Sequence, residues 1–139
     1  MIVSTKGRYA LKAVFELAMT DIDTPMSLNT ISERTDLSEL YLEQIFSVLK
    51  KKGIVKSIRG VQGGYLLTRK PDEISAGEII KALEGELSPS KCLIDEGYCD
   101  MLDRCPTYMI WDRIKKSIDE VIDNTTLQDM IDEYNKKNL

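Results

Sequence analysis

All three cysteines of the chain lie within one stretch of fourteen residues, CLIDEGYCDMLDRC, and the chain contains no histidine. Six residues separate Cys92 from Cys99, and five separate Cys99 from Cys105. Thiolate sulfur is the ligand that soft metals prefer, and iron–sulfur clusters are bound mainly through cysteine. The stretch is therefore a candidate cluster-binding site, with Cys92, Cys99 and Cys105 as its ligands.

The spacing alone keeps other interpretations of this stretch open, because three cysteines leave the fourth ligand undetermined. Glu96, Asp100 and Asp103 lie in the same loop and offer oxygen ligands. A zinc ion with three sulfur ligands and one oxygen or nitrogen ligand is tetrahedral, so zinc competes with a cluster. Three unligated thiols are the remaining interpretation.

The cellular compartment of the thiols is predicted from signals that the sequence does not show. We expect a cytoplasmic protein with no membrane partner, since the sequence shows no secretory signal and no apolar run of the length that a membrane span needs. An odd number of cysteines in a reducing compartment favours metal or redox chemistry over disulfides. Without a histidine, a nucleophile–base motif or a phosphate-binding loop, the chain is not expected to be an enzyme.

Charge is distributed unevenly along the chain, whose formal net charge is −4. Residues 1–70 contain eleven Lys and Arg against seven Asp and Glu, whereas residues 71–139 contain eight against sixteen. No acidic residue occurs over 44–71, and the basic residues of this segment are Lys50, Lys51, Lys52, Lys56, Arg59, Arg69 and Lys70. Such a segment indicates a surface that binds a polyanion, although an ordinary solvated lysine surface has the same composition.

Apolar periodicity and turn residues predict the elements that must position these groups. Helices are expected over 5–19, 27–35, 38–53 and 75–85. Ser27, Ser38 and Ser75 are the expected N-caps of the last three. Two short strands, 54–58 and 65–68, flank the glycine-rich turn RGVQGG and predict a hairpin.

A further helix is predicted after the cysteine loop, followed by a short one over 125–134. Trp111, Ile114, Ile118 and Val121 recur at 3-4-3 spacing, which is typical of a helix–helix interface. We therefore expect these four residues to lie in a helix–helix interface.

Helix, short helix, tight turn, longer helix and hairpin is the order of a winged helix-turn-helix, whose third helix enters the major groove of DNA. The apolar stripe of that helix must face the core and leaves other side chains outward. Ser38 and Tyr41 can bond phosphates, and Gln44 can pair with an adenine edge. Glu43 can accept a hydrogen bond from a cytosine amino group.

The hairpin supplies the other predicted DNA contacts. Lys56 and Arg59 are basic residues of the segment without acids, and Arg59 can enter a minor groove. Gly60 beside it lets the backbone approach DNA closely.

Three segments of the chain resemble the Rrf2 family of bacterial transcription regulators: STKGRYAL, LSELYLEQIFSVLKKKGIVKSIRG and GGYLLTRKPDEISAGEIIKALEG. The resemblance implies a homodimer with a winged helix-turn-helix in each subunit and a long C-terminal helix that crosses to the partner. It thereby assigns the helix–helix interface of Trp111, Ile114, Ile118 and Val121 to the dimer. Carried over by position, the family's recognition helix, wing and start of the dimer helix contain Ser38, Tyr41, Glu43, Gln44, Arg59 and Trp111.

The expected fold class is mainly α, a winged helix-turn-helix with a long C-terminal dimerisation helix. Residues 1–85 form the DNA-binding domain, 86–106 the cysteine-containing loop, and 107–139 the dimerisation helix and C-terminal helix.

The resemblance also bears on the cofactor, because cluster-binding members hold three cysteines in the loop before the dimer helix. Cys92, Cys99 and Cys105 occupy that loop, with a first gap one residue longer than usual. The iron–sulfur regulator supplies a histidine where this chain has Tyr108, and the nitric-oxide sensor supplies an aspartate in the region where this chain has Arg8. The resemblance thus implies a [2Fe-2S] or [4Fe-4S] cluster whose fourth ligand is neither the histidine nor the aspartate of those two regulators.

We therefore expect a homodimeric repressor whose binding to a double-stranded DNA operator is tuned by an iron–sulfur cluster. The alternative within the family is a cluster-free cysteine-metabolism repressor that responds to a partner enzyme or to thiol state, because LEGELSP and IDNTTLQDM resemble that branch. A redox or electron-carrier iron–sulfur protein is the alternative of another class, and it would not need the basic hairpin.

Overall fold

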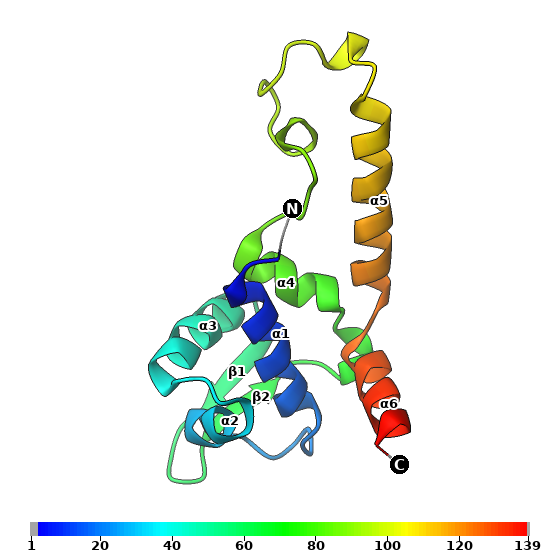
Figure 1. Ribbon diagram of the computed structural model, residues 1–139. Coiled ribbons are helices and arrows are strands. Elements are labelled where there is room, and N and C mark those ends of the chain that lie inside the picture. The colour runs from blue at the N-terminus through cyan, green and yellow to red at the C-terminus, as the bar shows by residue number, and fades with distance from the viewer. Residues whose placement is uncertain (1–2, 139) are drawn as a thin grey trace.

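The computed structural model describes residues 3–138, which form a mainly helical fold with one small sheet (Figure 1). The helices are α1 (Thr5–Ala18), α2 (Leu28–Thr35), α3 (Glu39–Lys51), α4 (Ala76–Glu84), α5 (Tyr108–Asn124) and α6 (Leu127–Lys137). Strands β1 (Val55–Ile58) and β2 (Gly64–Leu67) pair antiparallel, with Val55 opposite Leu67. Short 3₁₀ turns cover Pro71–Glu73, Lys91–Leu93 and Leu102–Arg104. The element order confirms the predicted winged helix-turn-helix with a long C-terminal helix.

Serine caps begin three of the helices, as the sequence predicts. The Ser27 hydroxyl oxygen accepts from the N–H of Thr30 at 3.1 Å, and Ser38 accepts from Tyr41 at 3.2 Å. Such a bond satisfies one of the N–H groups that a helix start leaves without a partner. Between α2 and α3, Asp36 takes a left-handed conformation, which makes the tight turn of the helix-turn-helix.

The core of the winged helix-turn-helix lies between α1, α3, α4 and the hairpin. Val14, Phe46 and Ile79 are completely buried there. The aromatic rings of Phe46 on α3 and Tyr65 on β2 have centroids 4.8 Å apart, which holds the hairpin against α3. The recognition helix and the wing are therefore parts of one packed unit.

Helix α6 also belongs to this core, although it follows the long helix in sequence. Leu127 is completely buried, and its N–H donates to the Ile74 carbonyl at 2.9 Å. Phe15 of α1 and Tyr134 of α6 pack edge to face, with ring centroids 5.5 Å apart. The chain thus returns to the DNA-binding unit after α5.

Helix α5 extends away from the rest of the molecule, and the segment before it curves around at its far end (Figure 1). Every residue of α5 keeps some exposure to solvent. Among the described residues, no helix is both long and apolar enough to cross a membrane.

Candidate nucleic-acid interface and thiol loop

The orientation of α3 is set by its apolar stripe. Leu42, Ile45, Phe46 and Leu49 are buried against the core, so the opposite side of the helix faces solvent. Glu43 and Gln44 are exposed on this outer side, where base edges would lie in the major groove.

Two predicted phosphate contacts have further partners within the protein. The Ser38 oxygen accepts the cap bond, which leaves its hydroxyl hydrogen to be donated to a phosphate. Tyr41 is half-buried, and its ring packs edge to face against Tyr9 of α1, with centroids 5.8 Å apart. Helix α1 therefore fixes the position of the Tyr41 ring.

The hairpin places its predicted contacts on the surface. Lys56, Arg59 and Gly60 are all exposed. The Gly60 carbonyl accepts from Gly63 N–H at 3.0 Å and closes the turn. Val61 at the same turn is fully exposed. The turn is thus a projecting wing with a basic side chain at its base.

Most of the basic segment is likewise on the surface, along the end of α3 and the hairpin. The exposed residues are Lys50, Lys51, Lys52, Lys56, Arg59 and Lys70. Arg69 differs, because its guanidinium donates to the Glu73 carbonyl at 2.9 Å and pairs with Glu78. The end of α3 and the hairpin region therefore expose six basic side chains in an acidic protein, whereas Glu39 and Glu43 are exposed on the first half of α3.

The cysteine-containing loop 86–106, called the thiol loop below, carries three free and half-exposed cysteines. Cys92 Sγ lies 3.0 Å from Ser90 Oγ, and Cys99 Sγ accepts from Met101 N–H at 3.4 Å. Cys105 Sγ lies 3.4 Å from Thr107 Oγ1. This hydrogen bond, together with bonds from the Thr107 and Tyr108 backbone, lowers the pKa of the Cys105 thiol and favours its thiolate.

The donor types of the loop suit an iron–sulfur cluster, since cysteine is the usual ligand. The described part of the chain, residues 3–138, nevertheless contains no group of three Cys, His, Asp or Glu side chains placed to share one metal ion. The donor chemistry of the loop therefore suits a cluster, but the loop as folded does not bring all three thiols to one site.

The predicted dimer interface on α5 is open to solvent. Trp111 and Val121 are exposed, with Val121 at 65%, whereas Ile114 and Ile118 are half-buried. A shallow apolar groove of about 470 Å³ runs along this face of the helix. The four predicted interface residues thus lie on a helix face that the described residues, 3–138, cover only in part.

A cluster of charged residues joins α5 to the start of the thiol loop, although no sequence pattern predicted it. Lys115 Nζ donates to Glu86 at 2.9 Å, to Asp119 at 2.9 Å and to the Leu87 carbonyl at 3.3 Å. Its hydrogen bond is the main reason that the pKa of Asp119 is lowered. Lys81 of α4 adds an ion pair to Asp123 at 3.1 Å.

A second missed feature is Leu40, a large apolar side chain that is 69% exposed on the first turn of α3. Its position four residues before Gln44 was the available signal, because residues four apart share one face of a helix.

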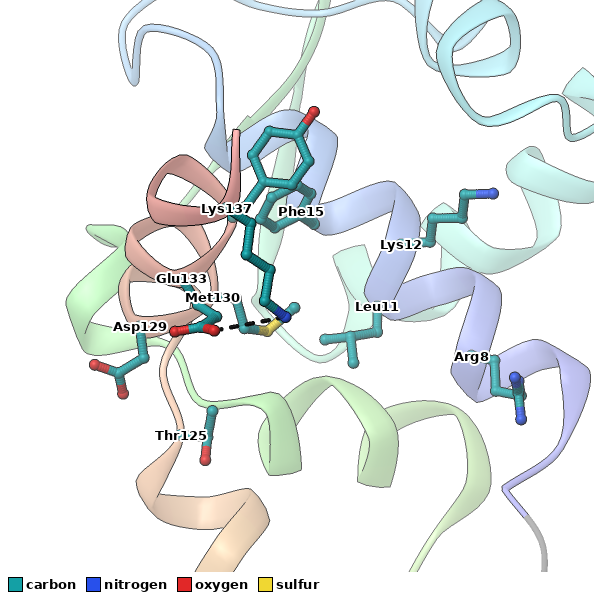
Figure 2. Close-up of a pocket in the computed structure, with 10 residues that line it drawn as sticks. Arg8, Leu11, Lys12, Phe15, Thr125, Asp129, Met130, Glu133 and Lys137 are labelled. Atoms are coloured by element: carbon teal, nitrogen blue, oxygen red, sulfur yellow. Dashed lines mark ion pairs between the residues drawn. The ribbon is translucent and has the colours of Figure 1, made fainter. Parts of the chain in front are cut away.

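A cleft of about 570 Å³ lies between α1 and α6 (Figure 2). Leu11, Phe15 and Met130 give it an apolar floor, and Glu133 and Lys137 form an ion pair of 3.5 Å at its edge. None of the predicted site residues lines this cleft.

Comparison with known proteins places the chain among transcription regulators. The Rrf2 family model, described as an iron-dependent transcriptional regulator, matches residues 3–133. The HTH-type transcriptional regulator CymR of Bacillus subtilis is 46% identical over 130 residues, covering 94% of this chain and 89% of that protein. The regulator IscR of Erwinia tasmaniensis is 39% identical over 131 residues, covering 94% and 79% respectively.

Solved structures agree with the sequence relatives. CymR, the global cysteine regulator of B. subtilis, superposes with a TM-score of 0.77 at 46% identity and covers 94% of this chain and 95% of its own. IscR of T. potens superposes with a TM-score of 0.82 at 43% identity and covers 100% of this chain and 92% of its own.

Proposed function

This chain belongs to the Rrf2 family of DNA-binding transcriptional regulators, and from this premise we propose that it acts as a homodimeric repressor of a double-stranded operator. Membership in this family is in line with the expectation of a protein that is not an enzyme. The observation that carries the proposal is the set of six exposed basic residues at the end of α3 and around the wing, in a chain of net charge −4. Phosphates are its natural ligands.

The division of roles within this surface follows from chemistry. Lys56 and Arg59 neutralise phosphates or enter a minor groove, while Ser38 and Tyr41 donate hydroxyl hydrogens to the backbone of DNA. Gln44 and Glu43 read base edges, with Gln44 matched to adenine and Glu43 to a cytosine amino group. Gly60 lets the wing lie close to the sugar–phosphate backbone.

Dimerisation through α5 is supported by the four apolar side chains Trp111, Ile114, Ile118 and Val121 on its uncovered face. A second copy would bury them in a helix–helix seam, the arrangement for which their spacing is suited. Two recognition helices would then meet two half-sites at a fixed separation.

The thiol loop is proposed as the signal-receiving segment, because it leads directly into α5. We assign Cys92, Cys99 and Cys105 as ligands of an iron–sulfur cluster, supported by their donor chemistry and by the likeness to IscR. When bound, such a cluster supplies redox and ligand-exchange chemistry that responds to oxidants and iron supply. Binding it requires the loop to close and bring the three thiols together.

A cluster-free repressor is the second candidate, and two observations favour it. The thiols are separate in the loop as folded, and CymR, a global cysteine regulator, shares 46% identity with this chain. In this candidate the free thiols themselves, or a partner enzyme, report cysteine status to α5.

The test is anaerobic purification followed by iron and acid-labile sulfide analysis and by titration of the protein onto DNA from its own promoter. We expect a coloured protein, specific binding, and loss of iron in a variant with all three cysteines changed to Ala. A colourless protein after reconstitution that still binds the promoter establishes the cluster-free candidate. Failure to bind any promoter DNA in either form overturns the proposed repressor.

The dimer is tested by Ile118→Asp, which places a charge in the proposed seam. Light scattering should report a dimer for the unmodified chain and a monomer for this variant. Lys116→Asp on the exposed side of the same helix is the matched control and should remain dimeric. A dimer that survives Ile118→Asp contradicts the assignment of this face.

A further inference from the structure

We propose that Leu40 is a specificity-determining residue that recognises the 5-methyl group of a thymine in the operator. The inference rests on the proposed function, since it assumes that α3 is the helix that enters the major groove. None of the DNA contacts predicted from the sequence includes this residue.

The first support is the direction in which Leu40 points. At about 100° per residue, Leu40 lies roughly opposite the centre of the buried stripe of Leu42, Ile45, Phe46 and Leu49. Gln44 and Ser47 follow it at the fourth and seventh positions and are exposed on the same side. Leu40 therefore begins the outermost ridge of the recognition helix, the ridge that reaches deepest into a groove.

The second support is that the first turn of α3 is firmly held. Ser38 caps it, and Glu39 accepts a hydrogen bond from the Asn29 amide of α2 at 2.7 Å. Leu40 is thus a 69% exposed apolar side chain on an ordered turn, where a polar residue would cost the fold nothing. The fold leaves this side chain free to contact DNA.

The third support is chemical complementarity. The thymine methyl is the one apolar group that a base pair presents in the major groove, and apolar side chains are its usual contacts. Leu40 adjoins Gln44, whose amide matches adenine. Together they select a step in which a thymine methyl lies beside the adenine that Gln44 reads.

The experiment first selects tightly bound duplexes from a random library with the full-length protein. Each thymine of the selected site is then replaced, one at a time, by deoxyuridine, which removes only the methyl group. Dissociation constants are measured by fluorescence anisotropy for the unmodified protein, Leu40→Ala and Leu40→Met. Thermal unfolding of each variant confirms that it is folded, as the exposure of position 40 leads us to expect.

We expect one thymine per half-site whose replacement weakens binding by about fourfold, the value of one buried methyl-sized group. Leu40→Ala should bind the thymine and uracil duplexes equally, and Leu40→Met should keep the preference. Uracil effects that are the same in Leu40→Ala and the unmodified protein overturn the inference, even though specific binding stands. A library that yields no preferred duplex overturns the proposed function, and this inference with it.

Discussion

Glu84, the last residue of α4, accepts a hydrogen bond from the backbone N–H of Gly7 at 3.2 Å. The Ser4 hydroxyl donates to the same carboxylate oxygen. One acidic side chain from α4 therefore caps the first turn of α1, where the positive end of the helix dipole favours a negative charge. This contact joins two helices that lie far apart in the sequence.

The first prediction is that Glu84→Gln lowers the free energy of unfolding by about 1 kcal/mol at neutral pH, the usual value of a charged or polar cap. Burial opposes ionisation, but the bonds from Ser4 and Gly7 outweigh it and lower the pKa of Glu84. The unfolded chain then binds the proton more readily, so this stabilisation is present above the ordinary glutamate pKa. It is lost as pH falls through the lowered pKa.

Urea unfolding of both proteins between neutral and acidic pH measures this effect. The stability difference between the two should shrink as the pH approaches the acid end. Glu120→Gln, at an exposed position of α5, is the control and should show no such trend. A Glu84→Gln difference that stays constant with pH contradicts the role of the charge.

The second prediction compares two glycines with positive φ, Gly64 at +151° and Gly53 at +76°. A Cβ at position 64 would collide with the backbone carbonyl of Met26, whereas no described atom lies within 4 Å of one at position 53. Gly53→Ala should cost about 1 kcal/mol of unfolding free energy from conformation alone. Gly64→Ala should cost about 3 kcal/mol or more of unfolding free energy, because the backbone of the hairpin or of the Met26 segment must move.

Thermal and urea unfolding of the two variants provide the measurement. Equal losses would show that the hairpin is free to move away from the Met26 segment, contrary to the packing seen here. The pair is its own control, since both substitutions are the same and both glycines lie near the wing.

Much of the DNA-binding unit could be predicted from the sequence, because its signals are local. The caps at Ser27 and Ser38 are read from residue type and position, and the hairpin from its flanking glycines. The exposure of Glu43 and Gln44 followed from the buried stripe of α3. The family likewise follows from dense local similarity.

The remainder depends on contacts between distant segments. Lys115 meets Glu86 only because α5 packs beside the start of the thiol loop, and no periodicity encodes that pair. The sequence of the short helix α6 shows which of its residues are apolar. It does not show that they pack into the core beside α1, where Leu127 is buried. Cysteine spacing gives the donor types, whereas the separation of the thiols is a property of the folded loop.

The third prediction concerns Lys115, whose side chain is only 15% exposed and which bonds Glu86, Asp119 and the Leu87 carbonyl. Lys115→Met should cost about 2 kcal/mol of unfolding free energy, because it removes three hydrogen bonds in a half-buried setting. Asp119 and Glu86 then keep only their longer ion pairs to Lys81, at 3.5 and 3.9 Å. Loss of this lysine should also return the pKa of Asp119 toward its usual value, since its hydrogen bond is the largest cause of the lowering.

Lys116→Met is the matched control, because the neighbouring lysine makes one exposed ion pair with Asp112 and should contribute less than about 0.5 kcal/mol. Hydrogen exchange of the α5 amides should increase in Lys115→Met relative to those of α3. Equal exchange in the two variants would show that the charge cluster does not hold α5 in place.

The last prediction concerns Arg59, which is exposed on the wing while Arg69 of the same hairpin is engaged within the protein. Arg59→Ala should weaken operator binding at every salt concentration. If its contact is a phosphate, the slope of log K against log salt should fall by about 0.9, the contribution of one phosphate contact. A lost base contact would instead weaken binding with an unchanged slope and relax the preference at one position.

Lys136→Ala removes the same charge from α6 and should leave both affinity and slope unchanged. Identical titrations for the Arg59 and Lys136 variants would remove the wing from the interface.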